Sequence, residues 1–383
     1  MKRFTTDRSR IKRLRIKRLG TVAVAAVMIL AGCSSSSSPP ADTTTDTTSA
    51  PDTSAQAASV AGSRTVRLVA YDSFTPPADV LKQFTADTGI SIEVLLKGDT
   101  GTMLNTAIIA KDQPFADVIW GIDSTFLSRA VSSGVMGPHG ITDSTTNPAL
   151  RPTVGADLVI PVDTSEVCVN ADTAAAPGSA DFGFDSLVDP ANKGKLVVEN
   201  PATSAPGLAF LLATVSKFGE TGWQDYWKAL KANDVKVVNG WDEAWNTEFS
   251  GAGAGKRPLV VSYSSSPVAS VLFGADPAAS TTPLAVLQDT CIGVIEYAGL
   301  LANNDTAHEA DARTVLKFLI SEPFQAGLAT NLFVYPARTG VALPEIYTRL
   351  GIGPVDSPLS VSPERVQAMR DAWIDEWTDI VLG

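Results

Sequence analysis

The residues best suited to chemistry lie in short clusters, most of them directly after a strand-like apolar run. Aromatic rings stack on flat groups and attract cations, carboxylates supply negative charge, and hydroxyls beside a helix start can receive a hydroxyl or phosphate group. These clusters predict a small-molecule site at the strand ends. The candidates are Tyr71, Asp72, Ser73, Gly101, Asp123, Asp163, Thr203, Ser204, Trp241 and Tyr263.

Several candidates also have a purely structural interpretation. Thr203 and Ser204 precede a helical segment and can be its caps. Asp123 can likewise be an N-cap, and Trp241 can be a packing aromatic. The sequence leaves both interpretations open for each of these residues.

The sequence offers little for catalysis or for a metal ion. It contains no G-x-S-x-G, H-E-x-x-H, Walker or G-x-G-x-x-G motif. Its two histidines, His139 and His308, lie away from the strand-end clusters. A ferric site would need a close pair of metal-binding tyrosines, which is not evident. We therefore expect no enzyme, no metal site and no cofactor, with a secreted hydrolase as the remoter alternative.

Strands and helices must alternate to position these clusters, and the apolar pattern predicts that they do. The expected strands lie at 66–70, 90–96, 117–120, 196–199, 235–238 and 259–263. This alternation is typical of an α/β fold. Ligands of open α/β sheets bind beyond the carboxyl ends of strands, so clusters in both halves of the 383-residue chain predict two lobes facing across a cleft.

The N-terminus has the organisation of an export signal. Residues 1–18 contain nine Lys or Arg and one Asp, and an apolar run follows that is far shorter than the roughly 20 residues of a membrane span. The run ends in Leu-Ala-Gly-Cys33, which resembles the lipobox of bacterial lipoproteins. We expect a signal peptide over 1–32, acylation of Cys33, and a flexible Ser/Thr/Pro-rich tether over 33–63. An ordinary signal peptide with an incidental Cys is the alternative.

Charge and cysteine content limit the partners and the compartment. The net charge is −11, and because the first 18 residues are basic, the body is more acidic still. An acidic body repels phosphate backbones, so no nucleic-acid partner is expected. Export would expose Cys168 and Cys291 to an oxidising compartment, which favours a disulfide between them over two buried thiols.

The clusters also carry a family resemblance that covers residues 65–380. In chain order they resemble segments of the extracytoplasmic solute-binding proteins of ABC importers, in particular the thiamine-binding branch. The matching segments are 69–74 (Val-Ala-Tyr-Asp-Ser-Phe), 116–123, 160–163, 201–208, 239–244, 261–267, 334–336 and 372–377.

The resemblance implies a type II periplasmic-binding-protein fold, with two mixed sheets flanked by helices and a ligand cleft between two lobes. It implies that lobe I comprises 64–162 and 268–383 and that lobe II comprises 163–267. It also adds Phe333 and Tyr335 to the candidate ligand-binding residues.

The ligand implied by the resemblance is thiamine or a phosphate ester of it. The implied partners are an ABC permease and its ATPase, with a monomeric protein anchored outside the cell membrane by Cys33. Thr75-Pro76-Pro77 stands where the thiamine branch has an aromatic residue, Ala269 stands in place of a Tyr, and Phe333 stands in place of a Trp. The alternative is another small cationic or oxyanion nutrient, such as a polyamine, a pyrimidine or an iron complex.

Overall fold

The computed structural model describes residues 64–303 and 306–383. The predicted signal peptide, Cys33 and the tether lie outside the described residues and stay predictions. Within the described part of the chain, no helix has both the length and the apolar character needed to cross a membrane.

The described strands form one mixed sheet in the order β2-β1-β3-β9-β5-β8-β6-β7, with β4 and β10 paired at its side. The strands are β1 (Arg64–Ala70), β2 (Ile90–Leu96), β3 (Val118–Asp123), β4 (Met136–Gly137), β5 (Val159–Asp172), β6 (Leu196–Glu199), β7 (Lys236–Val238), β8 (Leu259–Tyr263), β9 (Leu284–Leu301) and β10 (Tyr335–Pro336).

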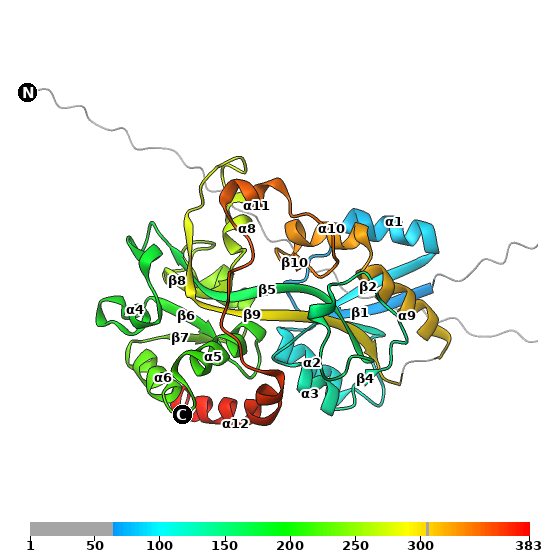
Figure 1. Cartoon of the computed structure of the whole chain (residues 1–383), viewed down its shortest axis with the longest axis horizontal. Coiled ribbons are helices and arrows are strands. Elements are labelled where there is room, and N and C mark those ends of the chain that lie inside the picture. The colour runs from blue at the N-terminus through cyan, green and yellow to red at the C-terminus, as the bar shows by residue number, and fades with distance from the viewer. Residues whose placement is uncertain (1–63, 304–305) are drawn as a thin grey trace, which may run out of the picture. The chain divides into compact units, whose positions relative to one another are not determined.

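Helices connect and flank these strands, as the alternation in the sequence predicts (Figure 1). They are α1 (Ala78–Thr88), α2 (Thr100–Ile109), α3 (Leu127–Ser132), α4 (Phe184–Val188), α5 (Ala205–Phe218), α6 (Trp223–Ala232), α7 (Trp241–Glu243), α8 (Ser266–Leu272), α9 (Thr306–Leu319), α10 (Glu322–Asn331), α11 (Glu345–Leu350) and α12 (Pro363–Val381). A π-helical turn, Ala244–Glu248, extends α7.

Two long antiparallel strands join the two halves of the sheet. β5 and β9 pair with each other and cross the middle of the view in Figure 1. The parallel group β1, β2 and β3 joins β9 through β3, and the parallel group β6, β7 and β8 joins β5 through β8. The two mixed sheets expected from the resemblance are therefore continuous through these strands. The division into lobes at 162/163 and 267/268 stays a prediction.

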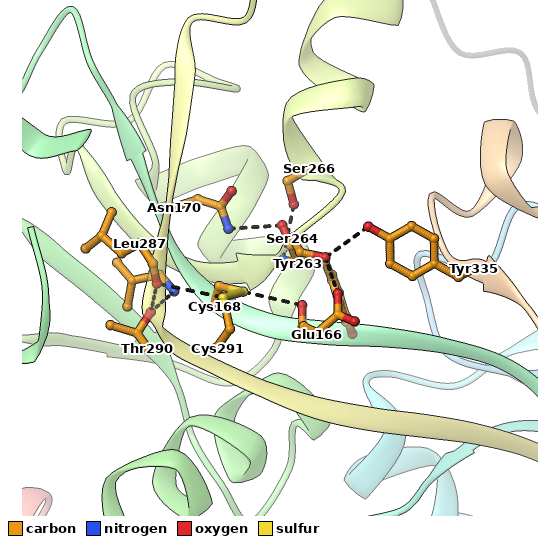
Figure 2. The surroundings of a disulfide bond; sticks show 11 residues. Glu166, Cys168, Asn170, Tyr263, Ser264, Ser266, Leu287, Thr290, Cys291 and Tyr335 are labelled. Carbon is orange, nitrogen blue, oxygen red and sulfur yellow. Dashed lines mark hydrogen bonds between the residues drawn. A yellow bond between two sulfur atoms is a disulfide. The ribbon is translucent and has the colours of Figure 1, made fainter. Parts of the chain in front are cut away.

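A disulfide links the two long strands between Cys168 of β5 and Cys291 of β9 (Figure 2). It lies where the β5–β9 ladder shifts register, between the pair Val167–Ile292 and the pair Val169–Leu287. Both sulfur-bearing residues are fully buried. The structure thus has the disulfide that the sequence favoured over two free thiols.

Close packing of α5 against the sheet fixes the start of that helix. Residues 205–215 of α5 are all buried, which an almost entirely apolar sequence allows. Gly207 permits the contact, because a Cβ there would lie 2.5 Å from the carbonyl oxygen of Glu199 at the end of β6. The N-terminus of α5 is therefore held beside the carboxyl end of β6.

Candidate functional site

A cavity of about 430 Å³ lies where β1 and β8 end, beside β9. We call it the aromatic cavity. Glu296 of β9 is the only charged side chain among its lining residues, and hydroxyl and amide groups supply most of the other polar atoms. The aromatic lining residues are Tyr71, Trp241, Trp245, Tyr263, Phe273 and Phe333.

A second cavity, of about 340 Å³, shares Tyr71, Ser73 and Trp241 with the first. We call it the acidic cavity, because its lining contains carboxylates and neither Lys nor Arg. The shared walls make the two cavities neighbouring parts of one binding region. The four carboxylates belong to Asp72, Asp99, Asp242 and Glu243.

Tyr71 is positioned by a glycine in the neighbouring strand. Gly121 of β3 has a φ of +89°, and a Cβ there would lie 2.4 Å from the Tyr71 ring. The ring therefore packs directly on the β3 backbone, in space that only glycine leaves free. Its hydroxyl donates a hydrogen bond to Glu296 Oε2 at 3.1 Å. Burial and the charge of Glu296 raise the pKa of Tyr71 well above its usual value, so the phenol is neutral.

A chain of hydroxyls orients Trp241 and Tyr263. Trp241 Nε1 donates to Ser262 Oγ at 2.8 Å, and Ser262 Oγ lies 2.8 Å from Ser266 Oγ. Ser266 Oγ in turn accepts the backbone N–H of Tyr263 at 3.1 Å. Trp241 also stacks on Trp245, with ring centroids 5.5 Å apart and planes 15° apart. The indole ring of Trp241 and the backbone at Tyr263 are thus held at the strand end before any ligand arrives.

Asp99 accepts hydrogen bonds from the first residues of three helices, α2, α5 and α7. Its Oδ1 accepts the N–H of Thr100 at 2.6 Å and, more weakly, the N–H of Ala205 at 3.4 Å, and its Oδ2 accepts the N–H of Trp241 at 2.9 Å. Burial raises the pKa of Asp99, and these backbone donors oppose that shift. The backbone amides that could have received a ligand anion at the starts of α5 and α7 are therefore already bonded to a carboxylate of the protein.

Glu296 and Asp163 form a buried carboxyl pair beneath the aromatic cavity. The two residues are directly paired across β5 and β9. Asp163 is completely buried, and Glu296 is 4% exposed at the cavity wall. Burial raises the pKa of both carboxyls, and the charge of Asp163 raises the pKa of Glu296 further.

Of the residues predicted from the sequence, the structure brings six into the lining of the two cavities. Tyr71, Ser73 and Trp241 line both, Tyr263 and Phe333 line the aromatic cavity, and Asp72 lines the acidic cavity. Tyr71 and Tyr263, which come from separate strands, line the same cavity.

Three further candidates satisfy backbone groups and line neither cavity. Asp123 Oδ1 accepts the N–H groups of Thr125 and Phe126 at the turn before α3. Ser204 is the N-cap of α5 and accepts the N–H of Gly207. Thr203 Oγ1 donates to the carbonyl of Asn239 at 2.7 Å. For these side chains the structural interpretation accounts for the observed contacts.

The last three candidates also lie outside the lining of the cavities. Gly101 packs on the loop before α5, where a Cβ would lie 2.7 Å from the Thr203 carbonyl carbon. Tyr335 is buried, with its hydroxyl 3.3 Å from Ser264 Oγ (Figure 2). Asp163 is fully buried beside Glu296, its direct partner across the two strands, and its charge raises the pKa of Glu296 and of Tyr71.

The sequence analysis missed Glu296, Asp99 and Trp245. Glu296 had a detectable signal, because it is the only charge in the apolar run 291–301 and a buried charge needs a compensating partner. Asp99 resembles an ordinary N-cap before Thr100, and its contacts with Ala205 and Trp241 arise only from tertiary structure.

Comparisons with known proteins agree with this fold. The chain has the type II periplasmic-binding-protein fold, a class that binds small solutes. Residues 79–352 match the family model described as bacterial extracellular solute-binding protein. The chain therefore belongs to this family of extracytoplasmic binding proteins.

Relatives with thiamine in their names cover most of the chain. The thiamine-binding periplasmic protein of Salmonella typhimurium is 27% identical over 313 residues, which are 80% of this chain and 90% of that protein. Its counterpart in Haemophilus influenzae is 24% identical over 327 residues, or 84% of this chain and 93% of that protein.

Solved structures of binding proteins superpose on this fold. A periplasmic thiamin binding protein superposes with a TM-score of 0.73 at 25% identity, covering 83% of this chain and 96% of that one. A ferric binding protein from Campylobacter jejuni, at 13% identity and a TM-score of 0.63, covers 82% of this chain and 99% of its own. The second likeness concerns the fold alone.

Proposed function

We propose that this protein is the receptor of an ABC importer and that it captures thiamine or a phosphate ester of thiamine in the binding region formed by the two cavities. The receptor delivers the ligand to a membrane permease that an ATPase drives. Acylated Cys33 anchors the receptor outside the cell membrane. No covalent chemistry is involved, because the ligand is bound and released.

One observation carries the proposal: three aromatic side chains from three separate strand ends converge on a cavity with one carboxylate in its wall. Thiamine combines a flat aminopyrimidine with a thiazolium cation. Tyr71, Trp241 and Tyr263 present ring faces that suit both groups, and a desolvated cation–π contact contributes about 2 kcal/mol. Glu296 supplies the opposite charge. The names of the relatives support the same ligand.

A ferric ion is a poorer fit, although Tyr71 and Tyr263 line one cavity. Ferric sites use ionised phenolates, whereas burial and nearby carboxylates raise the pKa of both tyrosines well above the usual value. The hydroxyl of Tyr71 is also bonded to Glu296. These contacts favour an organic cation over a metal.

Tryptophan fluorescence tests the proposal directly. Thiamine added to ligand-free protein should change the emission saturably at micromolar or lower concentration, because Trp241 lines both cavities. Trp241→Phe should reduce the signal. Trp377→Phe is the matched control, since Trp377 is buried in α12 against Trp227. A response to spermidine, sulfate or ferric citrate with none to thiamine would refute the proposed ligand.

Thiamine monophosphate extends the same titration. The acidic cavity has four carboxylates in its wall, and Asp99 already uses backbone amides at the helix starts. We expect the phosphate ester to bind more weakly than thiamine. Tighter binding of the ester would mean that these amides are released to the ligand.

The anchor is tested separately from the ligand. In a bacterial host with lipoprotein processing, the full chain should fractionate with the membrane, and Cys33→Ala should release it. Equal release of both proteins would support the alternative of an ordinary signal peptide.

A further inference from the structure

Glu296 lines the aromatic cavity and is paired with the fully buried Asp163, and the described residues provide no counter-ion for this carboxyl pair. Side chains paired directly across antiparallel strands project from the same face, with Cβ atoms roughly 5 Å apart. Glu296 has the Tyr71 hydroxyl as a donor, while neither carboxylate oxygen of Asp163 has a hydrogen-bond donor among the described residues. No ion pair in the described part of the chain includes either residue.

The groups around the pair add no positive charge. Tyr71 follows β1, Asp123 of β3 pairs with Glu296 from the side opposite β5, and Tyr263 ends β8. Each of these three groups is either a neutral phenol or a carboxyl. Two ionised carboxylates side by side in such a buried place are strongly disfavoured, and one proton between them removes the repulsion and gives Asp163 a hydrogen-bond partner.

We propose that Asp163 and Glu296 share one proton while the cavity is empty, and that a cationic ligand displaces this proton when it binds. This inference rests on the proposed function only in taking the ligand to be an organic cation. The empty pair carries one negative charge. On binding, the O–H bond of the shared carboxylic acid breaks, the proton passes to solvent, and the ligand cation lies against two carboxylates.

The exchange has a physical cause. A cation beside Glu296 stabilises the ionised form of that carboxyl, just as the charge of Asp163 destabilises it in the empty protein. The net charge of the carboxyl pair and its occupant therefore remains −1 in both states. Binding of the cation should tighten as pH rises, by up to about tenfold per pH unit while the empty pair is protonated.

Calorimetry at pH 7 measures the displaced proton. Thiamine is titrated into the protein in two buffers that differ in ionisation enthalpy, and the difference in binding enthalpy gives the protons released. We expect about one proton per thiamine in the wild-type protein. Asp163→Asn should reduce the release, because the charge of Asp163 no longer favours protonation of Glu296. Glu296→Gln should weaken binding of the cation at least tenfold.

A nearby buried carboxyl provides the matched control. Glu166 lies on the same strand, is 6% exposed, and bonds Ser264 without lining either cavity (Figure 2). Glu166→Gln should therefore leave the proton release unchanged. Loss of the release in this variant, or binding of thiamine to the wild type with no release, would overturn the proposal.

An infrared measurement on the ligand-free protein separates this inference from the proposed function. The difference spectrum of wild type minus the double variant Asp163→Asn and Glu296→Gln at pH 7 should contain the C=O band of one protonated carboxylic acid. Other buried carboxyls, such as Glu199, cancel in the difference. If the band is absent, the shared proton is refuted whatever the ligand is. If the band is present and thiamine does not bind, the proposed function fails while the shared proton is established.

The wild-type protein alone provides a last check that needs no variant to fold. Adding thiamine should remove the protonated-acid band and add carboxylate absorption. A band that persists at saturating thiamine would overturn the displacement.

Discussion

Removal of the Cys168–Cys291 disulfide should destabilise the protein strongly and leave its ligand affinity almost unchanged. The disulfide joins residues that are 123 positions apart in the sequence. A crosslink that closes a loop of this length removes unfolded-state entropy equivalent to about 4.9 kcal/mol at 25 °C. The entropy of unfolding scales with chain length, and dividing this loss of free energy by that entropy gives a fall in melting temperature of roughly 4–7 °C.

Affinity should survive because the ladder itself fixes the strands near the site. Asp163 pairs with Glu296, and the pairing continues through Val167 and Ile292 before the register shift at the disulfide. These hydrogen bonds do not depend on the sulfur atoms. The position of Glu296 in the cavity wall should therefore be kept without the disulfide.

The assay compares the wild-type protein with the double variant Cys168→Ala and Cys291→Ala. Denaturant unfolding should give a free energy of unfolding lower by about 3–5 kcal/mol for the variant. A reducing agent should lower the stability of the wild type and leave the variant unchanged. Thiamine affinity, measured by fluorescence, should stay within about twofold in both proteins.

Two results would refute this reasoning. A loss of stability below about 1 kcal/mol would mean that the disulfide does not constrain the unfolded chain as loop closure requires. A loss of affinity of more than tenfold at unchanged fold would mean that the disulfide, and not the β5–β9 ladder, positions Glu296.

Three other substitutions test separate parts of the account. Trp241→Leu should weaken thiamine binding about 10- to 30-fold in a calorimetric titration, because the cation–π contact is lost; an unchanged affinity would remove Trp241 from the site. Glu199 is fully buried, and its carboxyl oxygens have no hydrogen-bond partner among the described residues. Burial raises the pKa of Glu199, so the folded protein keeps a proton that the unfolded chain releases above the ordinary pKa of a glutamate. Stability is therefore lost as pH rises above that value, and Glu199→Gln should raise the melting temperature at pH 7 but not at pH 4. Ser204→Ala removes the N-cap of α5 and should cost about 1 kcal/mol in denaturant unfolding while thiamine affinity stays within about twofold; a large loss of affinity would assign Ser204 to the ligand.

The aromatic part of the site was predictable from the sequence for a topological reason. Parallel strands bring their carboxyl ends to one edge, so residues that follow such strands converge whatever their separation in the chain. Trp241 and Tyr263 obey this rule through the parallel strands β7 and β8, whereas Tyr71 follows β1, which runs opposite to β8 and brings Tyr71 to the cavity from the other half of the sheet. The alternation of strands and helices in the sequence is therefore enough to predict that these residues lie at strand ends.

The carboxylates were predictable only in part, because a cap and a ligand-binding residue have the same local sequence. Asp123 and Ser204 each follow a strand and precede a helix, and both turned out to bond nearby backbone N–H groups. Asp99 has the same signature, yet it lines the acidic cavity and also bonds a helix start 142 positions away. Such long-range acceptors have no marker in the sequence.

The departures from the thiamine-binding branch gather in one place. Thr75, Ala269 and Phe333 all line the aromatic cavity. Phe333 keeps a ring there with a φ of +57°, and Ser265 Oγ donates to its carbonyl. The comparison of free thiamine with its larger phosphate ester therefore also tests the shape of this cavity.

The carboxylate in the wall of the aromatic cavity lies on a central strand, and this has a consequence for the charge of the site. β9 is paired with β3 on one side and with β5 on the other, so Glu296 has Asp123 and Asp163 as direct neighbours. The backbone cannot move these charges apart without breaking ladder hydrogen bonds. Because these carboxyls cannot move apart, the site can respond to the charge of a ligand only by gaining or losing a proton. Binding of a cation and release of a proton should therefore be coupled in this protein.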